Sequence, residues 1–205
     1  MTQKINIFDT ISNDTGSRIK SFEWYMRKIE ELRGRGLITK NKLIQYDEMI
    51  TSRIDIGSMF LMVYANPKYK QTLPFFDAFP LILPFGMDSA HLTAFNLHYI
   101  PVKARWILLK QLMQNSEIST VRRASEDARL ALDYNLLKGA SNYDLLKPCI
   151  HQYLYDRIGQ LKGGMFLKIP PAEWPIASLL PVQDFRSGNR GYSAERVWKE
   201  SMGGK

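Results

Sequence analysis

The sequence predicts an α+β fold, in which a small antiparallel sheet or SH3-like barrel is wrapped by helices. Three short apolar and aromatic runs, at residues 58–65, 79–85 and 91–100, have the composition of strands. They follow one another closely along the chain, and short links of this kind favour antiparallel pairing. Segments with helical spacing of apolar residues lie on both sides, and residues 165–169 form a further short strand that is predicted to close the sheet.

The size and composition indicate one ordinary globular domain. The chain has 205 residues, of which 45% are hydrophobic and 23% are charged. Its single cysteine, Cys149, has no partner for an internal disulfide, which indicates a reducing site of synthesis. No apolar run is long enough to span a bilayer, and the first ten residues, MTQKINIFDT, do not resemble a signal peptide. We therefore expect no membrane partner.

The N-terminal part is predicted to be an arm followed by helices. Residues 1–17 are polar, with Ser, Asn, Asp, Thr and Gly together at 12–16, and are expected to order only against another molecule. The region 18–57 is predicted to be helical. Its first helix begins at Ser17 or Ser21 and continues to about Arg33, and a second begins at Thr39.

The middle of the chain, residues 58–185, is predicted to be the core domain, with a β-hairpin region at 58–100. The hairpin turn is placed at residues 86–89, where Gly, Asp and Ser cluster. Proline lacks an amide donor, so Pro80 and Pro84 predict that the strand at 79–85 is either an edge strand or bent.

Helices and a second arm are predicted after the hairpin. The helical spacing indicates helices over 102–114, about 119–138 and 148–161, and a proline-punctuated helix from 170–174 to Pro181. Residues 186–205 are predicted to be a C-terminal arm, within which Val197 and Trp198 anchor a short helix to the body.

The charge of the chain permits contact with a polyanion. The formal net charge is +8, but the excess of basic residues is spread along the chain and forms no basic tail. Aromatic residues at 75–106 lie close along the chain to Lys68, Lys70, Lys103 and Arg105, which suits base stacking beside phosphate contacts. A packed core with an aromatic protein interface explains the same residues and is the favoured alternative. The candidate phosphate contacts are Lys68, Lys70, Lys103, Arg105, Arg122 and Arg123.

No motif for catalysis is present, and we expect neither an enzyme nor a cofactor. The sequence has no GxxxxGK[ST], GxGxxG, HExxH, GxSxG or CxxC motif. Three histidines and one cysteine are too few to favour a zinc site. Strand alternation places Asn96 and His98 on one face, where Asp77 or Asp88 could orient His98 as a general base. A structural histidine that bonds within the sheet is the favoured alternative.

Several segments resemble virion proteins of contractile-tailed, T4-like bacteriophages. The first is LPFFDAFPL at 73–81, followed by NLHYIP at 96–101 with Arg105. The C-terminal part contributes FLKI at 166–169, Glu173 and Trp174, LPVQDF at 180–185, and Val197 with Trp198. Together with an N-terminal helix and residues 59–68, the resemblance covers about 22–201.

The resemblance implies a protein of the phage particle, synthesised in the host cytoplasm, and no catalytic residue. The leading hypothesis is a structural or assembly component of the neck, tail or baseplate. It would be held in place by other virion proteins, with a symmetric ring as one possible arrangement. The alternative is a protector of packaged DNA ends, a label carried by proteins with this pattern, and a nuclease is a distant third. The residues assigned to protein interfaces are Phe75, Phe76, Asp77, Asn96, His98, Trp174 and Trp198.

Overall fold

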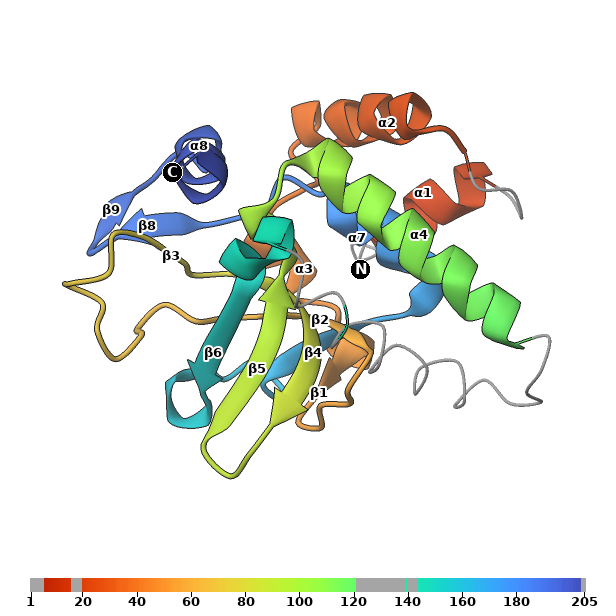
Figure 1. Ribbon diagram of the computed structural model, residues 1–205. Coiled ribbons are helices and arrows are strands. Elements are labelled where there is room, and N and C mark those ends of the chain that lie inside the picture. Colours follow the sequence, from red (N-terminus) through yellow and green to blue (C-terminus); the bar gives the residue numbers. More distant parts are fainter. Residues whose placement is uncertain (1–5, 16–19, 121–138, 140–143, 204–205) are drawn as a thin grey trace.

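The computed structural model describes residues 6–15, 20–120, 139 and 144–203, and these form an α+β fold with two antiparallel sheets (Figure 1). The larger sheet has six strands in the order β1-β7-β2-β4-β5-β6, and the smaller has three in the order β3-β8-β9. The strands are β1 (Ile50–Thr51), β2 (Met59–Met62), β3 (Phe76–Asp77), β4 (Leu81–Met87), β5 (His91–Asn96), β6 (Ile150–Leu154), β7 (Phe166–Ile169), β8 (Phe185–Ser187) and β9 (Arg190–Gly191).

Helices cover one face of the larger sheet. Figure 1 shows α1, α2, α4 and α7 gathered at one end of it, while α8 lies beside the small sheet. The α-helices are α1 (Ile7–Thr15), α2 (Phe22–Gly34), α3 (Lys40–Leu43), α4 (Val102–Thr120), α7 (Trp174–Leu179) and α8 (Ala194–Gly203). Short 3-10 helices are η1 (Asp47–Met49), η2 (Leu97–Tyr99), η3 (Asp144–Cys149), η4 (Tyr155–Arg157) and η5 (Pro171–Glu173).

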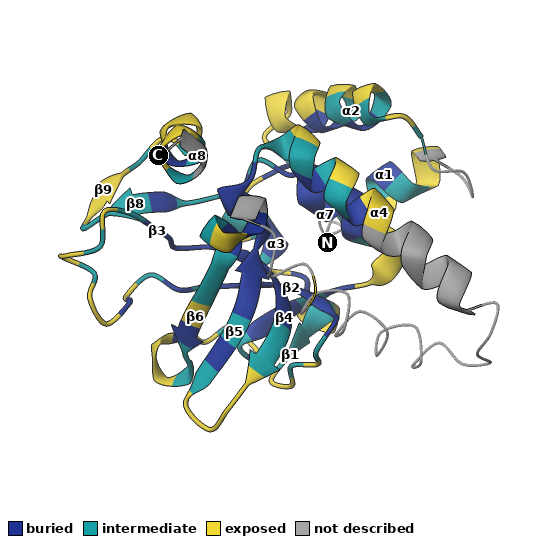
Figure 2. Cartoon of the chain, viewed as in Figure 1, coloured by how far each residue is buried: buried dark blue, intermediate teal, exposed yellow. Residues whose placement is uncertain are grey.

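The larger sheet is buried on both faces, and strand alternation assigns its side chains to two clusters. In β2, Met59 and Leu61 join the main core with the helices, whereas Phe60 and Met62 belong to a second cluster. Figure 2 shows the buried segments concentrated in the strands and in α7, with exposed residues on the loops and the outer side of α2. Because both faces of the sheet are buried, residues 58–65 form a continuous apolar run without polar alternation.

The predicted strands are confirmed in outline, but no closed barrel forms in the described part of the chain. The strand β4 lies between β2 and β5, so it is not an edge strand. It is bent instead, because its register with β5 shifts between Pro84 and Gly86. The strand at 165–169 is confirmed as β7, but it pairs with β1 and β2 and leaves β6 as an open edge.

Two predicted elements change type. The helix predicted at 148–161 is replaced by η3, β6 and η4, because Ile150, Leu154 and Ile158 are spaced by four residues, which fits a strand's period of two as well as a helix. The strand predicted to reach Ile100 ends at Asn96. There the Asn96 side chain accepts a hydrogen bond from the amide of His98 at 3.0 Å and turns the chain into η2.

The helical predictions are confirmed in part. Ser21 caps α2 through a hydrogen bond from the Trp24 amide, and Thr39 caps α3, although α3 ends after four residues. The proline-punctuated helix is η5 followed by α7, and α8 carries the buried Val197. The predicted hairpin turn begins later than expected, since β4 extends to Met87. Much of the helix predicted at 119–138 lies outside the described residues.

Neither predicted arm is free of the body. Residues of the expected N-terminal arm form α1, whose Ile7, Phe8 and Ile11 are at most 1% exposed in the main core. The amide of Ile7 also donates to the hydroxyl of Tyr46 at 2.9 Å. At the other end, β8 pairs with β3 and β9 pairs with β8, so residues expected in the C-terminal arm belong to the small sheet.

Glu173 gives the region beneath α1 a pH-dependent stability. Its Oε2 atom is buried and has no hydrogen-bond partner among the described residues. Burial, together with the charge of Asp9, raises the pKa of Glu173 to about 7. The native protein therefore binds this proton more tightly than the unfolded chain, and the stability gained at low pH is lost as the pH rises from about 4.5 to about 7.

We expect Glu173→Gln to raise the free energy of unfolding at pH 8 by about 1–2 kcal/mol, after allowance for partial solvent screening, and to change it little at pH 4.5. Urea unfolding at several pH values measures this difference. Glu48→Gln, at an exposed position, is the control and should leave the pH profile unchanged. A Glu173→Gln profile parallel to that of the unmodified protein would contradict the expectation.

Candidate functional site

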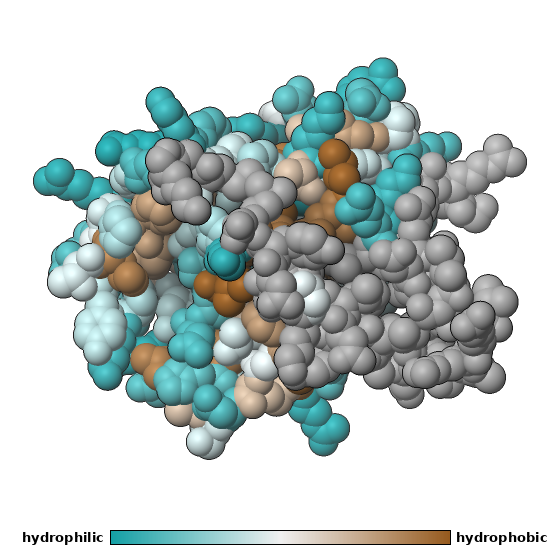
Figure 3. All heavy atoms as spheres, viewed as in Figure 1, coloured by the Kyte–Doolittle hydropathy of each residue, from teal (hydrophilic) through white to brown (hydrophobic). Residues whose placement is uncertain are grey.

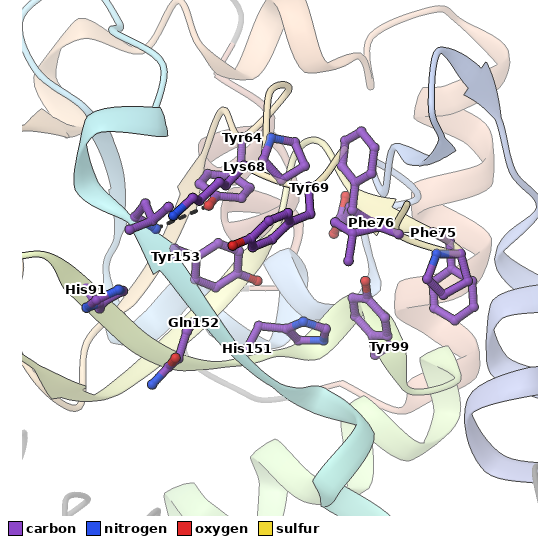
Figure 4. Close-up of a pocket in the computed structure, with 15 residues that line it drawn as sticks. Tyr64, Lys68, Tyr69, Phe75, Phe76, His91, Tyr99, His151, Gln152 and Tyr153 are labelled. Carbon is purple, nitrogen blue, oxygen red and sulfur yellow. Dashed lines mark hydrogen bonds between the residues drawn. The ribbon is translucent and has the colours of Figure 1, made fainter. Parts of the chain in front are cut away.

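A cleft of about 620 Å³ opens between the edge strand β6 and the segment that connects β2 to β3 (Figure 4). Its lining comes from Tyr64 to Asp77 on one side and from β6 on the other, with His91 and Tyr99 completing it. In the space-filling view of Figure 3, brown apolar side chains gather on the left and are surrounded by teal hydrophilic ones. The lining of the cleft combines aromatic rings with the positive charge of Lys68.

One wall of the cleft is a row of packed aromatic rings. Tyr64 packs edge-on against Tyr153, with ring centroids 4.9 Å apart. His151 lies next to Tyr153 on β6 and packs on Tyr99 at 4.1 Å, and Tyr99 in turn contacts Phe75 at 5.9 Å. Because Tyr64, Tyr153 and Tyr99 are at most 6% exposed, the wall is rigid and largely dry.

Tyr69 stands alone on the opposite side. Figure 4 shows its ring directed into the cleft from the β2–β3 segment, across from His151 and Tyr153. It is 62% exposed, the most exposed large hydrophobic residue among those described. A hydrogen-bonded turn holds it, since the amides of Thr72 and Leu73 both donate to the Tyr69 carbonyl at 3.0 Å.

Lysines lie beside this tyrosine. The Lys68 ammonium lies 5.4 Å from the centre of the Tyr69 ring, and Lys68 also lines the cleft. Lys70 donates a hydrogen bond to the side chain of Asn66 at 3.2 Å, which fixes its position at the same turn. Two cations therefore flank the one exposed ring, an arrangement that suits a ligand with a planar apolar part and a negative charge.

Beneath the cleft, Asp77 is the acceptor at the centre of a buried polar network. One carboxylate oxygen accepts from the amides of Phe79 at 3.0 Å and Asp184 at 3.1 Å. The other accepts from the side chains of Asn96 at 3.2 Å and His98 at 2.7 Å. Burial alone would raise the pKa of Asp77, but His98 and the amide donors outweigh it, so the pKa lies below its ordinary value and the carboxylate is charged.

His98 is the neutral partner in this network. Burial lowers its pKa more than Asp77 raises it, so the imidazole donates its Nδ1 proton to Asp77 without carrying a charge. The side chain is 0% exposed, which rules out direct contact with a ligand in this conformation. The structure therefore favours the structural role over the general base, and the orienting carboxylate is Asp77, while Asp88 contacts His91.

Arg105 completes the network and joins four elements. Its guanidinium donates to the carbonyls of Ile100 at 2.8 Å, His98 at 3.2 Å and Ser178 at 3.4 Å. It also lies over the ring of Trp198, whose Nε1 donates to the His98 carbonyl at 2.8 Å. Arg105 is 0% exposed, and its guanidinium donates to carbonyls within the fold. The predicted phosphate contact at this residue is therefore wrong.

The other predicted phosphate contacts do not form one group. Lys68 lines the cleft and Lys70 follows on the same turn, outside the lining, whereas Lys103 lies at the start of α4, near Glu23 of α2. Arg122 and Arg123 lie outside the described residues. Of the six candidates, the structure thus brings two together at a surface that also presents an exposed aromatic ring.

Most residues assigned to protein interfaces are parts of the core. The side chains of Phe76, Asp77, Asn96, His98 and Trp174 are at most 5% exposed. Trp174 donates from its indole to the Ile169 carbonyl at 2.9 Å, and Trp198 is held by His98 and Arg105. Only Phe75 reaches the cleft with a half-buried ring, which stacks on Tyr192 at 5.6 Å. The unusual residues of these motifs stabilise the fold.

The residues that line the cleft were largely missed by sequence reasoning. His151 and Tyr153 were assigned to a helix, which hid the fact that both point to one side of a strand. For Tyr69 a local signal exists, because a large ring between two lysines after a turn is not a core pattern. Among the described residues, no group of three or more His, Cys, Asp or Glu side chains could hold a metal ion. None of the described helices has the length and apolar character needed to cross a bilayer.

Comparison with known proteins gives one match. Residues 6–201 match the family model described as "Phage T4 terminal DNA protecting protein". Neither the curated proteins nor the solved structures contain a significant match. The family match confirms the resemblance to T4-like phage proteins, and it supports the DNA-end alternative better than the structural neck, tail or baseplate component that was expected first.

Proposed function

Because this chain belongs to the phage T4 terminal DNA protecting protein family, we propose that it binds the ends of double-stranded DNA and shields them without catalysis. The match spans nearly the whole chain, so the family relationship applies to the complete fold and not to one motif. The proposed contact surface is the cleft between β6 and the β2–β3 segment.

The observation that carries this assignment to the cleft is the exposed Tyr69 flanked by Lys68 and Lys70. Lysine ammonium groups bind phosphates as point charges, and an aromatic ring stacks on any base without regard to sequence. A DNA end differs from the interior of a duplex in offering a base that is covered by no neighbour on one side. A site that combines stacking with phosphate contact therefore distinguishes ends from internal sites.

Protection without chemistry is consistent with the arrangement of the acids. The buried carboxylate of Asp77 accepts hydrogen bonds from four donors, and the half-buried Asp184 is paired with Lys40 and Arg186. We propose that occupation of the end itself excludes exonucleases, and that the protein acts in the phage particle, where the packaged genome has its ends. Other virion proteins, in a ring or otherwise, are further proposed partners.

Protection from digestion tests this function directly. A linear duplex labelled at one end is incubated with an exonuclease that degrades duplex DNA from its termini, with and without the protein. We expect protection at protein concentrations near the dissociation constant, and no protection by the double variant Lys68→Gln/Lys70→Gln at that concentration. Equal digestion with and without the unmodified protein would overturn the proposal.

The lysine variants should also change the salt dependence. Each phosphate contact contributes about −0.9 to the slope of log affinity against log salt, so the double variant should lose a slope of about 2. Titration of labelled duplex by fluorescence anisotropy between low and physiological salt measures this slope. Lys162→Gln is the control, because Lys162 is 87% exposed and lies away from the cleft beside Asp47. A double variant with an unchanged slope would place the phosphate contacts elsewhere.

A further inference from the structure

We propose that the cleft binds one unpaired base at the DNA end, stacked between Tyr69 and the aromatic wall of β6. This inference rests on the proposed function and specifies its ligand, since it requires the terminal base to leave the duplex. A volume of about 620 Å³ lies within the range of roughly 300–1,000 Å³ of pockets that bind small organic ligands. Such a space suits one nucleotide and not a base pair with both backbones.

A planar ligand that stacks on both of its faces needs an aromatic ring on each side of the cleft. On one side, the His151 ring packs on those of Tyr99 and Tyr153. Tyr99 and Tyr153 are each 4% exposed, whereas His151 is half-buried, so His151 is the ring of this wall that a base can reach. Tyr69, on the facing side, packs against no other aromatic ring among the described residues, and the ammonium of Lys68 lies 5.4 Å from the centre of its ring. Stacking on aromatic side chains is worth about 1–3 kcal/mol per base, so a base between these sides would cover the exposed ring.

The floor of the cleft offers polar atoms for the edge of a base. Just after β6, the amide of Tyr155 donates to the carbonyl of Ala90, on the side of β5. The amide of Leu154, one residue earlier, points to the opposite side and donates to the hydroxyl of Tyr64. Backbone groups alternate along an antiparallel strand, so those of Gln152 point the same way as those of Leu154. Because β6 is the edge of the sheet, the amide and carbonyl of Gln152 face the cleft.

The electrostatics of the cleft match a neutral base with a charged phosphate. Burial lowers the pKa of His151 to about 4, so its ring is uncharged at neutral pH and acts as a stacking surface. Among the residues that line the cleft, Lys68 carries the positive charge, and Lys70 adds a second cation on the same turn, where the phosphate of the terminal nucleotide would lie. An extended peptide pairing with the β6 edge is the competing occupant, but an uncharged backbone would leave the charge of Lys68 without a counter-charge.

The test compares three labelled duplexes of one sequence: one with blunt ends, one with a single-nucleotide overhang, and one whose overhang carries an abasic residue and so keeps the phosphate. We expect the overhang with a base to bind about tenfold tighter than the abasic overhang. A 2-aminopurine at the overhang should also lose fluorescence when the protein binds, because its ring stacks on aromatic side chains.

Variants of Tyr69 assign the effect to the cleft. Tyr69→Ala and Tyr69→Leu should abolish the difference between base and abasic overhang, whereas Tyr69→Phe should keep it because the ring is retained. Thermal unfolding should be unchanged in all three, since the residue is 62% exposed. The lysine contacts stay in place in these variants, so binding to blunt ends should persist at a reduced level.

Equal affinity for the base and abasic overhangs would overturn the base-binding inference while leaving end binding intact. The same holds if Tyr69→Ala binds every duplex as the unmodified protein does, in which case the cleft serves another ligand such as a peptide strand. If no duplex with ends binds better than a closed circle, the proposed function itself fails. The two failures are therefore distinguishable in one set of titrations.

Discussion

Replacing Arg105 with alanine is expected to lower the free energy of unfolding by about 3–5 kcal/mol, the largest effect of any single substitution considered. The guanidinium is buried and donates to the carbonyls of His98, Ile100 and Ser178. Without it, these acceptors lose their donor, and the charge of Asp77 loses its nearest buried counter-charge. Burial lowers the pKa of Arg105 to about 10, so the side chain is still charged at neutral pH.

Urea unfolding followed by circular dichroism measures this loss. Lys103→Ala, two residues earlier on the exposed side of α4, is the control and should change stability by no more than about 0.5 kcal/mol. Arg105→Met, which fills the space without donors, should recover only part of the loss. Equal stability of Arg105→Ala and Lys103→Ala would contradict the prediction. It would mean that water can replace the hydrogen bonds of the guanidinium and that the network does not determine the stability of the fold.

Phe8→Ala should produce the second largest effect, a loss of about 3–4 kcal/mol. Phe8 is 0% exposed and packs edge-on against Tyr46, with ring centroids 6.2 Å apart. The substitution leaves a cavity between α1 and the rest of the main core, where Ile7 and Ile11 are also buried. The same unfolding experiment measures it, and Asn13→Ala, at an exposed position of α1, is the matched control.

This prediction distinguishes an integral helix from an arm. An arm that orders only against another molecule would tolerate Phe8→Ala with no change in the isolated protein. A difference of less than about 0.5 kcal/mol between Phe8→Ala and Asn13→Ala would therefore restore the interpretation of residues 1–17 as an arm.

The contrast between α1 and the sheet shows what the sequence could predict. The strands β2, β4, β5 and β7 were located because their apolar runs are local and bounded by Gly, Pro and Asn. The apolar face of α1 has only Ile7, Phe8 and Ile11 among nine residues, and the polar residues that follow them favoured an arm. Its burial depends on Tyr46 and other distant residues.

The site was less predictable than the fold, for a similar reason. Its wall requires β6 to lie next to the β2–β3 segment, although Tyr64 and Tyr153 are far apart in sequence. The spacing of Ile150, Leu154 and Ile158 fits both a helix and a strand, and only pairing with β5 decides between them. Arg105 shows a different limit. From the sequence, a basic residue is expected at the surface, and only the structure reveals its three carbonyl partners, at His98 and Ile100 and at the distant Ser178.

Competition between linear and covalently closed duplex DNA tests the central claim most directly. A short labelled linear duplex is held by the protein at physiological salt, and unlabelled competitors of identical sequence are added in equal nucleotide amounts. If the protein binds ends, the linear competitor should displace the label at least about tenfold more effectively than the closed circle, and more salt should weaken both. Equal displacement by the two competitors would show that the protein does not recognise ends, and would contradict the account.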